Sequence, residues 1–338
     1  NKILQKVELT NPGSILSISN LSGYGLEFTG AITLNGASHF AVGTATASNV
    51  VPGLTLSGLV ADAGGYDLTK SGAGTLLLTN AGNTFGGATA TIDVLAGVLA
   101  ASSDGALGDS GNKVRLNVDG TTDLGFRATG TFASARTFVL NQPNNAFEVT
   151  AGNTLTLSTA FTLSATSNTL TKNDNGTLVL TASNPTLAGA ITVAGGTLRI
   201  GHATALGTSA LTTSGAGSVA YELTGGVTVA NALTLPTANG ATGIDGRGAL
   251  YAYSGSNTFS GLITQGTGVG ATFGAASGAT LTLSGGITTG NSTNFNAVAA
   301  DAIINLAGEN IAGGAWSDAR KAKLRESRLL PTRTIVRA

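Results

Sequence analysis

Short alternating segments of apolar and polar residues recur along the whole chain and predict β-strands. One six-residue pattern consists of a large apolar residue, a spacer, a small residue, a second spacer, and a β-branched or aromatic residue followed by Thr. It occurs at residues 28–33, 157–162, 187–192, 223–228, 259–264 and 283–288. Each copy predicts a strand, a tight turn and a second strand. From Leu157 onward, the intervals between successive copies are 30, 36, 36 and 24 residues, which are irregular but fall in the range that is typical of solenoids and repeat arrays.

A longer segment, residues 68–108, recurs with substitutions at residues 170–207. Both copies begin with Leu-Thr-Lys, continue with Gly-Thr-Leu-x-Leu-Thr and close on Ala-Leu-Gly. The second copy becomes slightly shorter after the Gly87/Gly189 pair, while the apolar register continues on both sides of it. A stack of strands tolerates such a change because turns absorb length and the inward alternation does not.

The alternation also predicts which side chains point into the interior of the stack. They are Ile92, Val94, Leu178, Leu180, Ile191, Val193, Leu198 and Ile263.

The repeated segments resemble the autotransporter-associated β-strand repeat of bacterial surface proteins. The resemblance rests on Leu-Thr-Lys-x-Gly-x-Gly-Thr-Leu-x-Leu-Thr, Asn-Thr-Phe-x-Gly-Gly and a Gly-x-Leu close at residues 68–108, and less fully on residues 170–207 and 251–264. It implies an all-β fold, a right-handed parallel β-helix (β-solenoid), on an exported protein at the bacterial cell surface or outside the cell. In that family the repeat is a scaffold unit, so the resemblance brings no catalytic residue with it.

Composition agrees with a solenoid and narrows the classes of function. The chain has 50 Gly in 338 residues, 10% charged residues, 42% hydrophobic residues and no net charge, so its surface is built largely from Thr, Ser, Asn and Gly. Cysteine is absent, which excludes disulfides and thiolate catalysis. No run of 18 apolar residues exists, so no membrane insertion is expected. Because the sequence starts at Asn1 without Met, we expect a mature or partial product.

Acidic residues are densest between residues 104 and 123, where Lys113 and Arg115 separate them. They are Asp104, Asp109, Asp119 and Asp123. Asp beside Gly or Ser is typical of turns, and this is the favoured interpretation; a calcium site or a polysaccharide-lyase centre is the alternative. The segment 243–248 resembles a calcium-binding glycine-rich repeat but occurs once, so no metal or other cofactor is expected.

Other residues that could support chemistry are isolated. His39 and His202 are the only histidines and lie far apart in the sequence, so we expect turn or surface roles for them. Lys70 and Lys172 occupy equivalent repeat positions, which suggests that they keep strand edges soluble.

The composition changes at residue 315, dividing the chain into a solenoid (1–314) and a short basic helical or extended tail (315–338). The tail's basic residues are Arg320, Lys321, Lys323, Arg325, Arg328, Arg333 and Arg337. With two acidic residues beside these seven, the tail carries +5 and the remainder −5. It is expected either to cap the last coil or to bind the next subunit; it lacks the interleaved aromatics of a nucleic-acid site.

The sequence therefore predicts a non-catalytic structural protein that associates with itself end to end. The first alternative is an adhesin or passenger domain that binds carbohydrate or a host surface, and the second is a polysaccharide-lyase-like β-helix enzyme. Besides other copies of the chain, carbohydrate and the cell envelope are the partners considered. Exposed aromatic platforms would favour the adhesin, because sugars stack on them.

Overall fold

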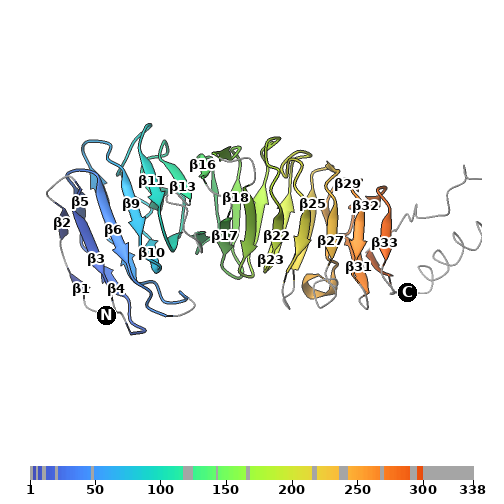
Figure 1. Ribbon diagram of the computed structural model, residues 1–338, viewed down its shortest axis with the longest axis horizontal. Helices are drawn as coiled ribbons and strands as arrows, with labels where there is room; N and C mark the ends of the chain where they lie inside the picture. Colours follow the sequence, from blue (N-terminus) through green and yellow to red (C-terminus); the bar gives the residue numbers. More distant parts are fainter. Residues whose placement is uncertain are drawn as a thin grey trace, which may run out of the picture.

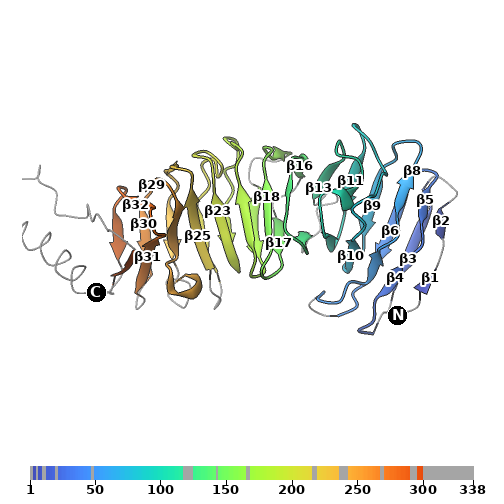
Figure 2. The same ribbon diagram turned by 180° about the vertical axis from the view of Figure 1, so that it is seen from behind.

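The computed structural model describes residues 3–4, 7–9, 13–19, 22–46, 49–116, 125–141, 144–164, 168–214, 219–235, 243–266, 270–289 and 295–299. These residues form short strands that stack side by side into an elongated body, with the N-terminal and C-terminal strands at opposite ends (Figures 1 and 2). The strands pair in parallel, so the chain is an all-β parallel solenoid. In the described ranges the helices are two single 3₁₀ turns, η1 (Gly105–Leu107) and η2 (Ile244–Gly246).

One sheet, called the main sheet, runs the length of the molecule and has thirteen strands. In spatial order they are β1 (Ile3–Leu4), β4 (Leu26–Phe28), β7 (Leu54–Leu56), β10 (Thr75–Leu78), β12 (Val98–Ala101), β14 (Gly125–Ala128), β17 (Asn144–Val149), β20 (Thr169–Asn173), β22 (Ile191–Val193), β24 (Leu211–Thr213), β27 (Leu233–Leu235), β30 (Ile263–Gln265) and β33 (Ile287–Thr289). Paired residues on neighbouring strands, such as Ile191 with Leu211 and Leu233 with Ile263, are one coil apart in the sequence, and the coils differ in length.

Two further sheets each extend along about half of the molecule, one in its N-terminal part and one in its C-terminal part. The N-terminal sheet contains β3 (Ile15–Ile18), β6 (Ser38–Val42), β9 (Leu68–Ser71), β11 (Thr91–Val94), β13 (Lys113–Leu116), β16 (Phe138–Leu140) and β19 (Thr162–Leu163). The C-terminal sheet contains β15 (Phe132–Ser134), β18 (Thr154–Leu157), β21 (Thr177–Leu180), β23 (Gly196–Ile200), β25 (Val219–Thr224), β28 (Leu250–Ser254), β31 (Ala271–Ala275) and β34 (Phe295–Ala299). Two small sheets complete the faces: β2 (Val7–Leu9), β5 (Ile32–Leu34) and β8 (Val60–Asp62), and β26 (Thr228–Val229), β29 (Ser256–Phe259) and β32 (Thr280–Leu283).

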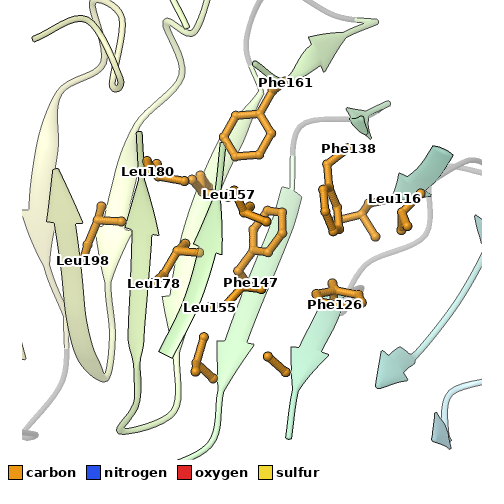
Figure 3. Close-up of a cluster of buried hydrophobic side chains, with 14 of the residues drawn as sticks. Leu116, Phe126, Phe138, Phe147, Leu155, Leu157, Phe161, Leu178, Leu180 and Leu198 are labelled. Carbon is orange, nitrogen blue, oxygen red and sulfur yellow. The ribbon is translucent and has the colours of Figure 1, made fainter. Parts of the chain in front are cut away.

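The predicted inward side chains form the core between the sheets. All eight, from Ile92 to Ile263, are at most 1% exposed, which confirms the assignment. Midway along the solenoid, phenylalanine rings fill the interior (Figure 3). Phe138 lies edge-on to Phe126 and Phe147, with ring centroids 5.1 and 5.3 Å apart, and Phe161 follows at 5.7 Å from Phe147. Edge-to-face geometry is the favoured arrangement for such pairs.

The predicted strand–turn–strand segments are the corners between faces. At residues 28–33, for example, β4 ends at Phe28 and β5 begins at Ile32. Residues 187–192 are the exception, since only the second strand, β22, forms there.

A buried asparagine replaces the missing strand at this corner. The side-chain oxygen of Asn184 accepts a hydrogen bond from the backbone N–H of Phe161 (2.7 Å), and its Nδ2 donates to the carbonyl of Ala205 (2.9 Å). Asn83 links Val60 and Ala106 in the same way, at 2.8 Å each. Each amide therefore provides hydrogen bonds between coils that a strand would otherwise make.

The two copies of the long repeat lie on different faces of the solenoid. The first copy places β9 in the N-terminal sheet and β10 in the main sheet, whereas the second places β20 in the main sheet and β21 in the C-terminal sheet. After β9 the chain passes through the N-terminal sheet four more times, at β11 within the first copy and at β13, β16 and β19 between the copies, before β20 begins the second copy in the main sheet. The offset between the copies therefore spans four coils plus one further face.

Candidate functional site

The predicted acidic cluster is, where the structure describes it, a turn fastened by an arginine. The Nε of Arg136 donates to Oδ1 of Asp104 (3.0 Å), and its other nitrogens donate to the carbonyls of Asp104, Gly108 and Asp109. Asp109 accepts a hydrogen bond from the N–H of Gly111 (2.8 Å), the local bond expected of a turn aspartate. Asp119 and Asp123 lie outside the described residues. Within those ranges, no group of three or more His, Cys, Asp or Glu side chains could hold a metal ion.

Lys70 and Lys172 do not keep strand edges soluble, because both side chains are fully buried. The ammonium of Lys70 donates to the carbonyls of Ser71, Gly72 and Ala96 at 2.7–2.8 Å. Lys172 donates to Asn173, Asp174 and Gly195 at 2.6–3.1 Å. Each lysine thus closes the turn after its own strand and ties it to the next coil. The alternation places these lysines on the inward side, as it does the leucines, which the prediction overlooked.

The environment of both lysines opposes their positive charge. Burial lowers the pKa of Lys70 from 10.5 to about 7. Burial lowers the pKa of Lys172 to about 7 as well, although the Asp174 and Glu148 carboxylates favour its charged form. The carbonyl oxygens around each ammonium are the groups that hold it in the interior.

The fold does not bring His39 and His202 together in one site. His39 lies in strand β6 rather than in a turn, and its Nε2 is 2.6 Å from the hydroxyl of Ser71 on the neighbouring strand. Burial and then the charge of Lys70 lower the pKa of His39. His202 lies in the turn after β23, as predicted, where its Nδ1 accepts a hydrogen bond from the N–H of Thr204 (3.2 Å).

Arginine, glutamate and tyrosine side chains meet on the outer surface of the C-terminal sheet. We call this group the Tyr253 cluster; its members are Arg199, Glu222, Arg247, Tyr251 and Tyr253. Nε and Nη2 of Arg199 both contact Oε2 of Glu222, at 2.8 and 2.7 Å. The guanidinium carbon of Arg199 is 3.4 Å from the ring centroid of Tyr253, and that of Arg247 is 5.2 Å from the ring centroid of Tyr251. The cluster therefore combines aromatic rings with an excess of positive charge.

The stacking register brings these residues together. Arg199 on β23 pairs with Glu222 on β25, and Glu222 pairs with Tyr251 on β28. The members of each pair are separated in the sequence by a single coil. Two signals could have revealed the site: opposite charges one coil apart, and tyrosines at positions 251 and 253, on the same side of one strand.

The basic residues of the tail, which the sequence suggests for assembly, are not among the described residues. They are Arg320, Lys321, Lys323, Arg325, Arg328, Arg333 and Arg337.

The fold and the internal repeats place the protein in the class of parallel β-solenoids with repeated sequence segments. Residues 68–101 and 170–200 match the family model of the passenger-associated-transport-repeat, so the chain carries two copies of this repeat. The matches coincide with strands β9–β12 and β20–β23, and they confirm the resemblance to the repeats of autotransporter passengers. No curated protein and no solved structure matches the chain. In the described part of the chain, no helix is long and apolar enough to cross a membrane.

Proposed function

We propose that the protein is a non-catalytic structural passenger, displayed at a bacterial surface or secreted, that forms a rod and associates end to end. The observation that carries the proposal is the coincidence of both matched repeats with successive strands of one continuous solenoid. Three buried basic side chains support the proposal. Lys70, Lys172 and Arg136 bond mainly to backbone carbonyls and hold turns and coils together.

End-to-end association is supported by the N-terminal end of the solenoid. Leu16 and Ile18 on β3 hold inward positions but are only partly buried, whereas their partners Phe40 and Val42 on the next coil are fully buried. Ile15 is 61% exposed at the same end. Strands at a solenoid end have unpaired backbone groups, and contact between unlike ends is not self-limiting, so fibres result.

Negative-stain electron microscopy of the purified chain over a hundredfold range of concentration tests the proposal. We expect rods that lengthen with concentration. The substitution Leu16→Asp, which places a charge at the partly covered end, should shorten them, and Ser17→Asp is the matched control because Ser17 is exposed on the same strand. Discrete rods of one length at every concentration would refute end-to-end association. Hydrolysis or cleavage of a polysaccharide by the pure protein would refute the non-catalytic role.

A further inference from the structure

The Tyr253 cluster lies where side chains face outward, yet its centre is buried. Leu198, Tyr221 and Leu250, the immediate neighbours of its strand residues, are fully buried in the interior. Glu222 therefore points to the outer surface, but it is only 1% exposed. An ionised carboxylate at such a position needs partners, and Arg199 provides two contacts to one of its oxygens.

A β-bulge places the tyrosine that gives the cluster its exposed ring. Leu223 pairs with Ala252 but Thr224 pairs with Ser254, so Tyr253 has no register partner on β25. Bulges re-aim side chains, and here Tyr253 reaches past β25 to lie against Arg199 on β23. The tyrosine remains 43% exposed although Arg199 is 3.4 Å from its ring centroid. The rest of the ring surface is thus available to a ligand.

The second arginine, Arg247, is held more loosely than Arg199 and leaves the cluster with a partly exposed cationic group. Nη2 of Arg247 is 3.7 Å from Oε1 of Glu222, beyond hydrogen-bond distance, and its side chain is 40% exposed. In the part of the chain that the structure describes, its guanidinium contacts are this ion pair and the ring of Tyr251. Since Arg199 already neutralises Glu222, Arg247 contributes a net charge of +1. A planar guanidinium is suited to bind a carboxylate through two hydrogen bonds.

From this arrangement we propose that the Tyr253 cluster binds an acidic saccharide, of the uronic-acid class. The apolar face of the sugar ring stacks on Tyr253, and the sugar carboxylate pairs with Arg247. Buried Glu222 holds Arg199 in place beneath the tyrosine, so the platform is organised before the ligand arrives. This inference goes beyond the structural role proposed above and does not depend on it, because a single rod could bind sugar without polymerising.

Surface plasmon resonance on two immobilised polymers tests the site. One surface carries polygalacturonate, and the other carries the same polymer with its carboxylates methyl-esterified. We expect the full-length protein to bind the acidic surface at least tenfold more tightly than the esterified surface. Tyr253→Ala and Arg247→Gln should each weaken binding to the acidic surface at least tenfold. Arg247→Lys, which keeps the charge but not the fork, should weaken it by a smaller factor.

Matched controls separate the site from general effects. Tyr24→Ala removes a tyrosine that is 73% exposed elsewhere, and Arg115→Gln removes a partly exposed arginine of the N-terminal sheet; both should bind like the wild type. Each variant's melting temperature shows whether it is folded. The basic tail could attract the polymer on its own, so the seven basic residues are also replaced by Gln in one variant. The proposal is overturned by absence of wild-type binding, by equal binding to both surfaces, by undiminished binding of Tyr253→Ala, or by binding that only the tail variant abolishes.

Discussion

At the scale of single residues, the solenoid uses polar side chains as internal fasteners. Lys70, Lys172, Asn83 and Asn184 are all buried, and each bonds to backbone atoms of a neighbouring coil. The substitution of Gly72 by Asp174 in the second repeat shows how tightly the lysine site constrains the turn. Both residues have positive φ, 74° and 60°, and both offer their carbonyl to the lysine. Asp adopts this conformation more readily than most residues with a side chain.

The lowered pKa values of the buried lysines predict a pH-dependent stability. An unfolded lysine has a pKa near 10.4, whereas Lys70 and Lys172 have a pKa of about 7 in the folded chain. Between these values the unfolded state binds more protons, so the free energy of unfolding should increase as the pH rises from about 7 towards 10. The slope can reach about 1.4 kcal/mol per pH unit for each lysine. Below pH 7 both states are protonated and this contribution to the slope vanishes.

Urea unfolding at pH 6, 8 and 10 measures the effect. Lys70→Met and Lys172→Met should each reduce the pH dependence, and Lys113→Met is the control because Lys113 is exposed. A wild-type slope that both buried-lysine variants retain would contradict the assignment.

At the scale of strands and turns, the core depends on strict alternation. Leu180 on β21 is 1% exposed and is flanked along its sheet by β18 and β23. Leu180→Asp would bury a charge with no partner, which costs several kcal/mol. We expect this variant to unfold at least the neighbouring coils, and circular dichroism with limited proteolysis would show the loss. The control is Thr156→Asp, because the Thr156 side chain is on the same face of the molecule but points outward; this variant should change the melting temperature little. If Leu180→Asp and the wild type had the same melting temperature, the inward assignment would be refuted.

The same alternation explains what could be predicted from the sequence. Strands, corners and inward residues follow from local periodicity, and these predictions were confirmed at Ile92, Leu178 and Ile263. Contacts between coils depend on the length of every turn between them, which local patterns do not fix. For this reason the contacts of Arg136 with Asp104 and of Tyr253 with Arg199 were not predicted. The two repeats lie on different faces of the solenoid for the same reason. Which face a segment occupies depends on the summed lengths of all the coils before it, and local patterns do not fix that sum.

At the scale of the whole molecule, a continuous main sheet makes the solenoid a rod with two unlike ends. Its strands run from β1 to β33 (Figure 1), so lengthening the rod requires only that one end pair with another chain. A charge difference between parts of the chain would favour pairing of one chain with the next, and the sequence contains such a difference.

The split between the basic tail and the acidic remainder predicts salt-dependent assembly. If residues 315–338 bridge subunits, deleting them should leave a β-rich protein that no longer polymerises. Replacing the seven basic residues by Gln should have the same effect while keeping the tail's length. Assembly of the intact chain should weaken as salt is added, because exposed charges are screened beyond about 8 Å at physiological ionic strength. If the tail instead caps the last coil, its deletion should expose an edge and increase aggregation. Light scattering thus changes in opposite directions for the two roles, and increased scattering of the truncated protein would rule out the bridging tail.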